Sequence, residues 1–199
     1  MTSPEPTVRF WPCPLPPARL TVIAVGTPRH APRAQVRQQV RQVLCQALAA
    51  LLACPAESVQ LHSTPGQAIR LTGPDPQRNI GLSLSHDEGL SLLAIHLDGP
   101  VGVDLVNYAQ LPTGDEELAR LADDYLGNST APALANLPLA ERRAAFAQAW
   151  ADLEARLKCR GLALGEAGPE QAKALAGCRS FALTLPDGFS GAVAVAARV

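Results

Sequence analysis

The stretch FAQAWADLEARLKCRGLAL, residues 146–164, decides how the second half of this chain folds. It contains no proline, and its apolar residues recur at helical spacing until a glycine ends the pattern at 161. The sequence therefore predicts a long helix from about Leu139 to Arg160. Side chains four residues apart form one stripe over two turns of such a helix. The stripe that combines a large aromatic ring with two opposite charges consists of Trp150, Glu154 and Lys158.

Short apolar runs between glycine and proline turns predict strands over much of the remaining chain. The first is LTVIAVG at 20–26, and a helix is expected to have Pro32 at its first position and to end before Pro55. After Tyr108 the pattern becomes helical. It predicts a helix over DEELARLADDYL, a loop that contains Pro and Asn, and then the long helix. The other predicted strands are SVQLH, AIRL, IGLSLS, LSLLAIHL, VGVDLV, SFALTL and GAVAVAARV. The chain therefore combines α and β structure.

Composition limits the classes of function. With 199 residues, of which 47% are hydrophobic and 18% charged, the chain is expected to be globular, as one domain or two half-sized lobes. A formal net charge of −1 argues against a nucleic-acid-coating protein, which would carry a basic excess. The N-terminus lacks a basic start followed by an apolar core, and the run ALAALLAC is too short to span a bilayer. We expect a cytoplasmic protein that does not bind a membrane.

The cysteines do not indicate a metal or disulfide framework. There are five, an odd number, and no two are spaced C-x-x-C. Cys45 falls on the apolar side of the first predicted helix, where we expect a small buried hydrophobe rather than a nucleophile. The five are Cys13, Cys45, Cys54, Cys159 and Cys178.

Three polar residues follow or end apolar strands and are candidates for chemistry. Asp104 ends the apolar run in VGVDL, where a buried carboxylate requires a partner. That partner is a metal ion on one interpretation, and a turn or an arginine on the other. Ser85 and His86 follow another strand in SLSHDEGL, while Gly102 would let the strand backbone approach a neighbour closely.

The order Ser-His, Gly-x-Asp and Trp-x-x-x-Glu-x-x-x-Lys-x-x-Gly resembles the Sfp-type 4'-phosphopantetheinyl transferases over roughly Arg41 to Leu164. The resemblance implies an α+β fold of two similar lobes related by a pseudo-twofold axis. The lobes would be residues 1–98 and 99–199, with coenzyme A bound in the cleft between them, and the chain would be a monomer.

The resemblance also implies the reaction and the roles of residues. A magnesium-dependent enzyme would transfer 4'-phosphopantetheine from coenzyme A to a serine of an apo acyl, polyketide or peptidyl carrier protein. Asp104 and Glu154 would bind the magnesium ion, and Glu154 would also take the serine proton. Lys158 would contact a coenzyme A phosphate and assist the leaving group. The remaining coenzyme A contacts would come from Ser85, His86 and Arg41, with Arg33 and Arg37 on the same helix face.

Several positions depart from the family pattern. Val106 replaces an acid two residues after Asp104, and Leu153 replaces the lysine before Glu154. Gly66-Gln67-Ala68 stands where the family has Gly-Lys-Pro, and Cys45 where it has a helix arginine. These departures support an alternative, a degenerate member that binds coenzyme A or a carrier protein without catalysis. A third interpretation treats the chain as a structural α+β interaction module.

Overall fold

The structure, a computed structural model, describes residues 8–11, 20–28, 30–64, 68–74, 79–127 and 129–196. The chain forms two compact units, Met1–Val101 and Gly102–Val199. Each unit contains a sheet and a long helix. The predicted mixture of α and β structure is therefore confirmed.

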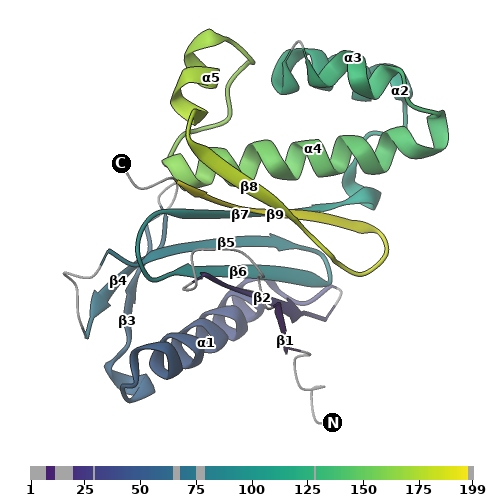
Figure 1. Ribbon diagram of the computed structural model, residues 1–199. Helices are drawn as coiled ribbons and strands as arrows, with labels where there is room; N and C mark the ends of the chain where they lie inside the picture. The colour runs from purple at the N-terminus through teal and green to yellow at the C-terminus, as the bar shows by residue number, and fades with distance from the viewer. Residues whose placement is uncertain are drawn as a thin grey trace. The chain divides into compact units, whose positions relative to one another are not determined.

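An antiparallel sheet and one helix form the body of the first unit (Figure 1). The strands lie in the order β1 (Val8–Trp11), β2 (Leu20–Gly26), β6 (Leu90–His96) and β5 (Gly81–Asp87). Helix α1 (Arg33–Leu52) packs one apolar face on this sheet, as its helical spacing of valine and leucine predicts. The fully buried side chains of this core include Ile23, Leu44, Leu48, Leu93 and Ile95.

Both ends of α1 follow from the sequence around them. Pro32 lies one residue before the helix rather than at its first position. The helix ends at Leu52, where Ala53 adopts a left-handed conformation with φ 51°. The short helix η1 (Ala56–Ser58) follows Pro55. A separate two-stranded sheet is then formed by β3 (Gln60–His62) and β4 (Arg70–Gly73).

The second unit has a three-stranded sheet under the long helix α4 (Leu139–Arg160). Its strands are ordered β7 (Val101–Asn107), β9 (Phe189–Ala196) and β8 (Cys178–Leu183), and β8 and β9 form an antiparallel hairpin. The bounds of α4 are those predicted, and Gly161 ends it in the left-handed conformation with φ 66°. In Figure 1, the other helices of this unit lie on the side of α4 away from the sheet.

The helices between β7 and α4 confirm one sequence prediction and correct another. DEELARLADDYL forms α2 (Asp115–Leu121) and the π-helical turn η3 (Ala122–Leu126), after the short helix η2 (Tyr108–Gln110). The following segment, predicted to be a loop, contains α3 (Thr130–Ala135). Its proline, Pro132, lies in the first turn, where a backbone N–H has no helical acceptor to lose.

The short helices η1 and η2, helix α5 (Pro169–Leu175) and strand β1 were not predicted. Helix α5 has only seven residues, too few for a periodic signal, and β1 lies in the proline-rich start of the chain. None of the helices among the described residues is long and apolar enough to cross a membrane.

Candidate functional site

The site begins with a close contact between β7 and α4. Gly102 has no side chain, and the backbone of α4 takes the space where one would be. A Cβ atom at Gly102 would lie 2.5 Å from the backbone nitrogen of Cys159 and nearer still to the carbonyl oxygen of Ala155. The predicted close approach of this strand to a neighbour is therefore confirmed, and the neighbour is the long helix. Side chains on the facing surfaces of β7 and α4 are brought together as a result.

Asp104 and Lys158 form a buried ion pair across this contact. The Lys158 Nζ lies 2.6 Å from Asp104 Oδ1 and 3.3 Å from the carbonyl oxygen of Val103, to which it also donates. The sequence predicted that Asp104 ends an apolar strand, but the residue is in the middle of β7. Only 7% of it is exposed. Lys158 is thus one protein partner of Asp104, and the contact joins a buried carboxylate to a partly exposed ammonium group.

Glu154 is the third charged group, one turn before Lys158 on the same face of α4. Burial raises the pKa of its carboxyl group, and the negative charge of Asp104 raises it further, while the positive charge of Lys158 opposes both. Asp104 and Glu154 are therefore close enough to repel each other. Two carboxylates and one ammonium group thus share a partly buried site, as the stripe in the sequence predicted for two of the three.

Trp150, the aromatic member of the stripe, belongs to an aromatic cluster. Its ring stacks on Phe146 and meets the edge of Tyr125, with centroids 5.6 Å away in both cases. This packing joins α4 to η3. The tryptophan therefore orients the helix that carries the two charged residues.

The two departures from the family pattern in this unit have a packing explanation. Val106 is two residues beyond Asp104, so it points to the same face of β7. It is buried in a cluster with the small residues Ala147, Ala151 and Ala155 of α4. Leu153 points the other way and packs with Leu157 and Leu175. The helix-facing position takes an apolar side chain because it is buried among apolar neighbours, where a carboxylate would lose its hydration.

The remaining predicted site residues belong to the first unit. Ser85 and His86 lie in β5, where Ser85 is buried and His86 Nδ1 lies 2.9 Å from Ser91 Oγ of the paired strand. Arg41 is exposed on α1, and its guanidinium group donates to the carbonyl oxygen of Leu61. Arg33 and Arg37 are exposed on the same helix.

The other positions at which the sequence differs from the pattern of the family it resembles are also in the first unit. Cys45 is partly buried against the core of the first unit, as expected. Gly66 and Gln67 lie outside the described residues.

The sequence did not identify three features of the second unit. Arg143 donates to the carbonyl oxygens of Tyr108, Leu111 and Pro112, at 2.7, 2.8 and 2.7 Å, and so fixes the segment that follows β7. Nothing in the spacing of Arg143 distinguishes it from a surface arginine. Asp152 and Arg156 line a cavity on α4, and their i, i+4 spacing was a signal that could have been followed.

The third feature is a pair of free thiols. Cys159 of α4 and Cys178 of β8 are buried in one cluster. A hydrogen bond from Cys159 lowers the pKa of Cys178 to about 7, against the effect of burial. The same hydrogen bond, together with burial, raises the pKa of Cys159. The sequence had presented these cysteines only as scattered.

Comparison with protein-family models and with curated proteins finds no match for this chain. The chemistry that the site can perform is therefore argued from its own residues. Carboxylate oxygens are the ligands that hard divalent cations prefer. The carboxylates of Asp104 and Glu154 lie here beside Lys158. In the part of the chain that the structure describes, no group of three or more His, Cys, Asp or Glu side chains is arranged to hold a metal ion.

Proposed function

We propose that this protein is a magnesium-dependent 4'-phosphopantetheinyl transferase, which moves 4'-phosphopantetheine from coenzyme A to a serine of an apo carrier protein. The observation that carries the proposal is the cluster of Asp104, Glu154 and Lys158 at the contact of β7 and α4. Breaking a pyrophosphate bond requires local positive charge and oxygen ligands for a cation. This cluster offers both.

The donor set fits a magnesium ion. The repulsion that raises the pKa of Glu154 is what a divalent cation between two carboxylates would relieve. Asp104 and Glu154 would hold the ion, which readily keeps water molecules as further ligands. When bound, it supplies positive charge that neutralises the pyrophosphate of coenzyme A.

The residues of the chain have separate tasks in this proposal. Lys158 binds a phosphate oxygen of coenzyme A. Its ammonium group offsets the negative charge of the leaving group, adenosine 3',5'-bisphosphate. Glu154 accepts the proton of the serine hydroxyl, directly or through water, because burial makes its carboxylate a better base than an exposed one. Asp104 holds Lys158 in position through their 2.6 Å bond.

The finer fold and the first-unit residues are part of the same proposal. Two similar lobes related by a pseudo-twofold axis would bind coenzyme A between them. Arg41, Ser85 and His86 would then contribute phosphate contacts, and a carrier-protein domain would supply the acceptor serine. What supports this part is the sequence order of the motifs, together with a sheet and a long helix in each unit.

Transfer is tested directly by incubating the protein with coenzyme A, magnesium and an apo carrier domain, then weighing the carrier by mass spectrometry. We expect a mass gain of one phosphopantetheine group, which chelation of magnesium abolishes. Glu154→Gln and Lys158→Ala should each slow transfer by roughly 100-fold or more, the range of one proton-transfer or charge-stabilising group. Arg160→Ala, which removes a positive charge two residues beyond Lys158 on α4, is the matched control and should transfer at the wild-type rate.

The same experiment separates the alternative function. Val106 and Leu153 bury apolar side chains where the family has an acid and a lysine. A protein that binds coenzyme A in calorimetry, but leaves every carrier type tested at its original mass, is a binding protein and not a transferase. A protein that transfers nothing and binds neither coenzyme A nor any carrier protein tested would refute the resemblance itself.

A further inference from the structure

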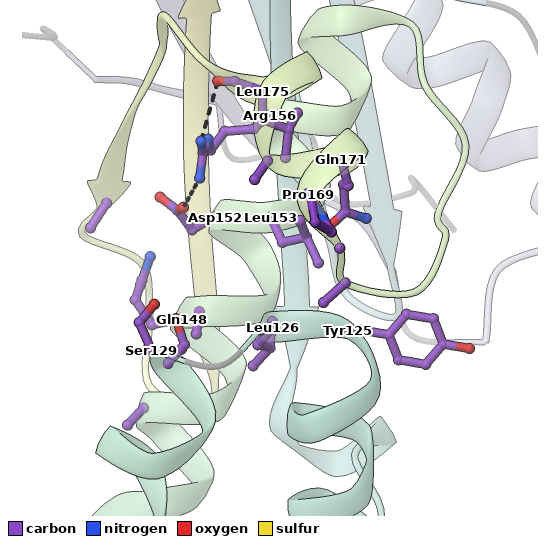
Figure 2. A pocket seen from close by; sticks show the side chains of 18 residues that line it. Tyr125, Leu126, Ser129, Gln148, Asp152, Leu153, Arg156, Pro169, Gln171 and Leu175 are labelled. Atoms are coloured by element: carbon purple, nitrogen blue, oxygen red, sulfur yellow. Dashed lines mark hydrogen bonds and ion pairs between the residues drawn. The ribbon is translucent and has the colours of Figure 1, made fainter.

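A cavity of about 950 Å³ lies in the second unit, on the face of α4 that points away from β7. Its α4 residues include Asp152 and Arg156, each two positions from Glu154. A two-residue step turns a helix by about 200°, so these side chains are opposite the cluster that contains Glu154. Figure 2 shows the cavity between α4, η3 and α5. It is therefore a different place from the proposed site of transfer.

One arginine of the cavity has few partners for its hydrogen-bond donors. Arg156 has five N–H groups. Its two nearest polar contacts are long: Nη2 lies 3.3 Å from the carbonyl oxygen of Leu175, and Nη1 lies 3.9 Å from Asp152 Oδ2 (Figure 2). Its buried Nε has no hydrogen-bond partner among the described residues. A half-buried guanidinium group held this loosely favours the addition of an anionic partner.

The rest of the wall is mostly apolar. Leu126 of η3, Leu153 of α4 and Leu175 of α5 contribute aliphatic side chains, and Ala149 leaves space between them. Uncharged polar side chains, among them Ser129, Gln148 and Gln171, and the carboxylate of Asp152 complete the wall, so Arg156 is the one positive charge among the lining residues that the structure describes. A cavity of this size with a largely apolar wall and a small number of polar groups that fix orientation is the form that small-molecule sites take.

The negative charge of Asp152 restricts the anion. A phosphate monoester carries nearly two negative charges at neutral pH, and Asp152 would repel it within a few ångströms of Arg156. A carboxylate carries one, and its two oxygens match the planar fork of a guanidinium group. We propose that this cavity binds a small monocarboxylic acid with an apolar body, whose carboxylate pairs with Arg156.

The first test needs no protein variant. Octanoate and octanamide share their apolar chain and differ in the charge of the head group. Amide chemical shifts of isotope-labelled protein would be followed as each is added. Octanoate should bind at least 10-fold more tightly, the contribution of a charge-assisted hydrogen bond, and should shift resonances of 125–130 and 169–175. Equal affinity for the two, shifts confined to residues that do not line the cavity, or no binding of octanoate up to about 5 mM would overturn the proposal.

The second test assigns the contact to its residue. Arg156→Ala should weaken octanoate binding about 10- to 100-fold and bring it close to that of octanamide. Arg160→Ala is the matched control, because Arg160 is on the same helix but donates to the carbonyl oxygen of Ala176 and does not line the cavity. Octanoate binding that is unchanged by Arg156→Ala, or weakened equally by both variants, would remove Arg156 from the site.

The third test examines the selectivity. Octyl phosphate should bind the wild-type protein more weakly than octanoate, because Asp152 repels its second charge. In Asp152→Asn both anions should bind more tightly, and octyl phosphate should gain more. A wild-type protein that prefers octyl phosphate would contradict the assignment of a monocarboxylate. The outcome is independent of the proposed transfer reaction, since no step uses Asp104, Glu154 or Lys158.

Discussion

Helix α4 carries two ion pairs that differ in nearly every respect. On the face toward β7, Lys158 meets Asp104 at 2.6 Å, with 34% and 10% of their side chains exposed. On the opposite face, Arg156 and Asp152 are 3.9 Å apart, with 31% and 39% exposed. The first pair joins two elements distant in sequence, whereas the second joins neighbours one turn apart. One helix thus presents a short ion pair to a buried carboxylate and a long ion pair to a more exposed one.

The difference shows how the same charges can have different consequences. Asp104 has little access to water, so removing Lys158 leaves a buried carboxylate without this positive charge beside it. Asp152 is 39% exposed and 3.9 Å from Arg156, so it loses little when Arg156 is removed. A short, tight ion pair such as Lys158–Asp104 suits a site whose charged groups must be held in position before a reaction. A long pair such as Arg156–Asp152 suits a site where a bound ligand can replace the contact within the protein. Four experiments test this contrast.

The largest effect is expected at Gly102, because the tight pair depends on the close contact of β7 with α4. Gly102→Ala places a Cβ within 2.5 Å of the Cys159 backbone nitrogen, so helix and strand must separate. We expect a loss of about 3 kcal/mol in the free energy of unfolding by urea, the upper end of the cost of overpacking. Gly165→Ala, where an added Cβ meets nothing within 4 Å, should be neutral. Equal stability of the two variants would show that β7 and α4 are not in contact.

The next effect concerns the two halves of the tight pair, which should be unequal. Lys158→Met leaves a buried carboxylate without its positive charge, and we expect a loss of about 2–3 kcal/mol. Asp104→Asn leaves a lysine that can extend toward water, and should cost less, about 1 kcal/mol. The double variant should be more stable than Lys158→Met alone. A double-mutant cycle with no coupling energy would contradict the buried pair.

The sequence was sufficient for features that depend on local chemistry. The bounds of α4 followed from helical spacing and Gly161, and β2 followed from a run of apolar residues between turns. The stripe of Glu154 and Lys158 needed only the helical repeat. These signals lie within one element, where neighbouring residues determine the outcome.

Features that depend on contacts between distant parts of the chain could not be predicted from the sequence. The partner of Asp104 stayed open between a metal ion, a turn and an arginine, because the lysine that binds it is 54 residues away. The burial of Val106 reflects alanines on a different element, and α5 has too few residues for a periodic pattern. The cavity beside Arg156 requires three elements at once. No spacing within one segment encodes that arrangement.

Glu154 provides a pH-dependent test of the tight face in metal-free protein. Its folded-state pKa is raised above the ordinary value of 4.5, so the unfolded chain releases this proton at lower pH than the folded one. The ionised form is therefore disfavoured on folding, and its destabilising effect develops as the pH rises above 4.5. Glu154→Gln removes that effect. Its stability relative to wild type should be greater at pH 7–8, and the difference should vanish below about pH 4.5.

Thermal melting in chelator across this pH range measures the difference. Glu166→Gln, an exposed residue in the loop after α4, makes the same change in net charge and is the control. A stability difference for Glu154→Gln that is independent of pH, or one that grows as the pH falls, would contradict the placement of Glu154 beside Asp104.

The smallest effect is expected on the opposite face of α4. Asp152→Ala removes a charge that is 39% exposed and lies 3.9 Å from its partner, and Arg156 still reaches water and the carbonyl oxygen of Leu175. The free energy of unfolding should change by less than about 0.5 kcal/mol, the usual range for an exposed i, i+4 pair, and the change should disappear at 1 M salt. Asp104→Asn measured at both salt concentrations is the comparison, because a buried pair is screened much less. A salt-insensitive loss of about 2 kcal/mol for Asp152→Ala would mean that the two faces of α4 hold their charges in the same way, and that Arg156 has no donors to offer a ligand.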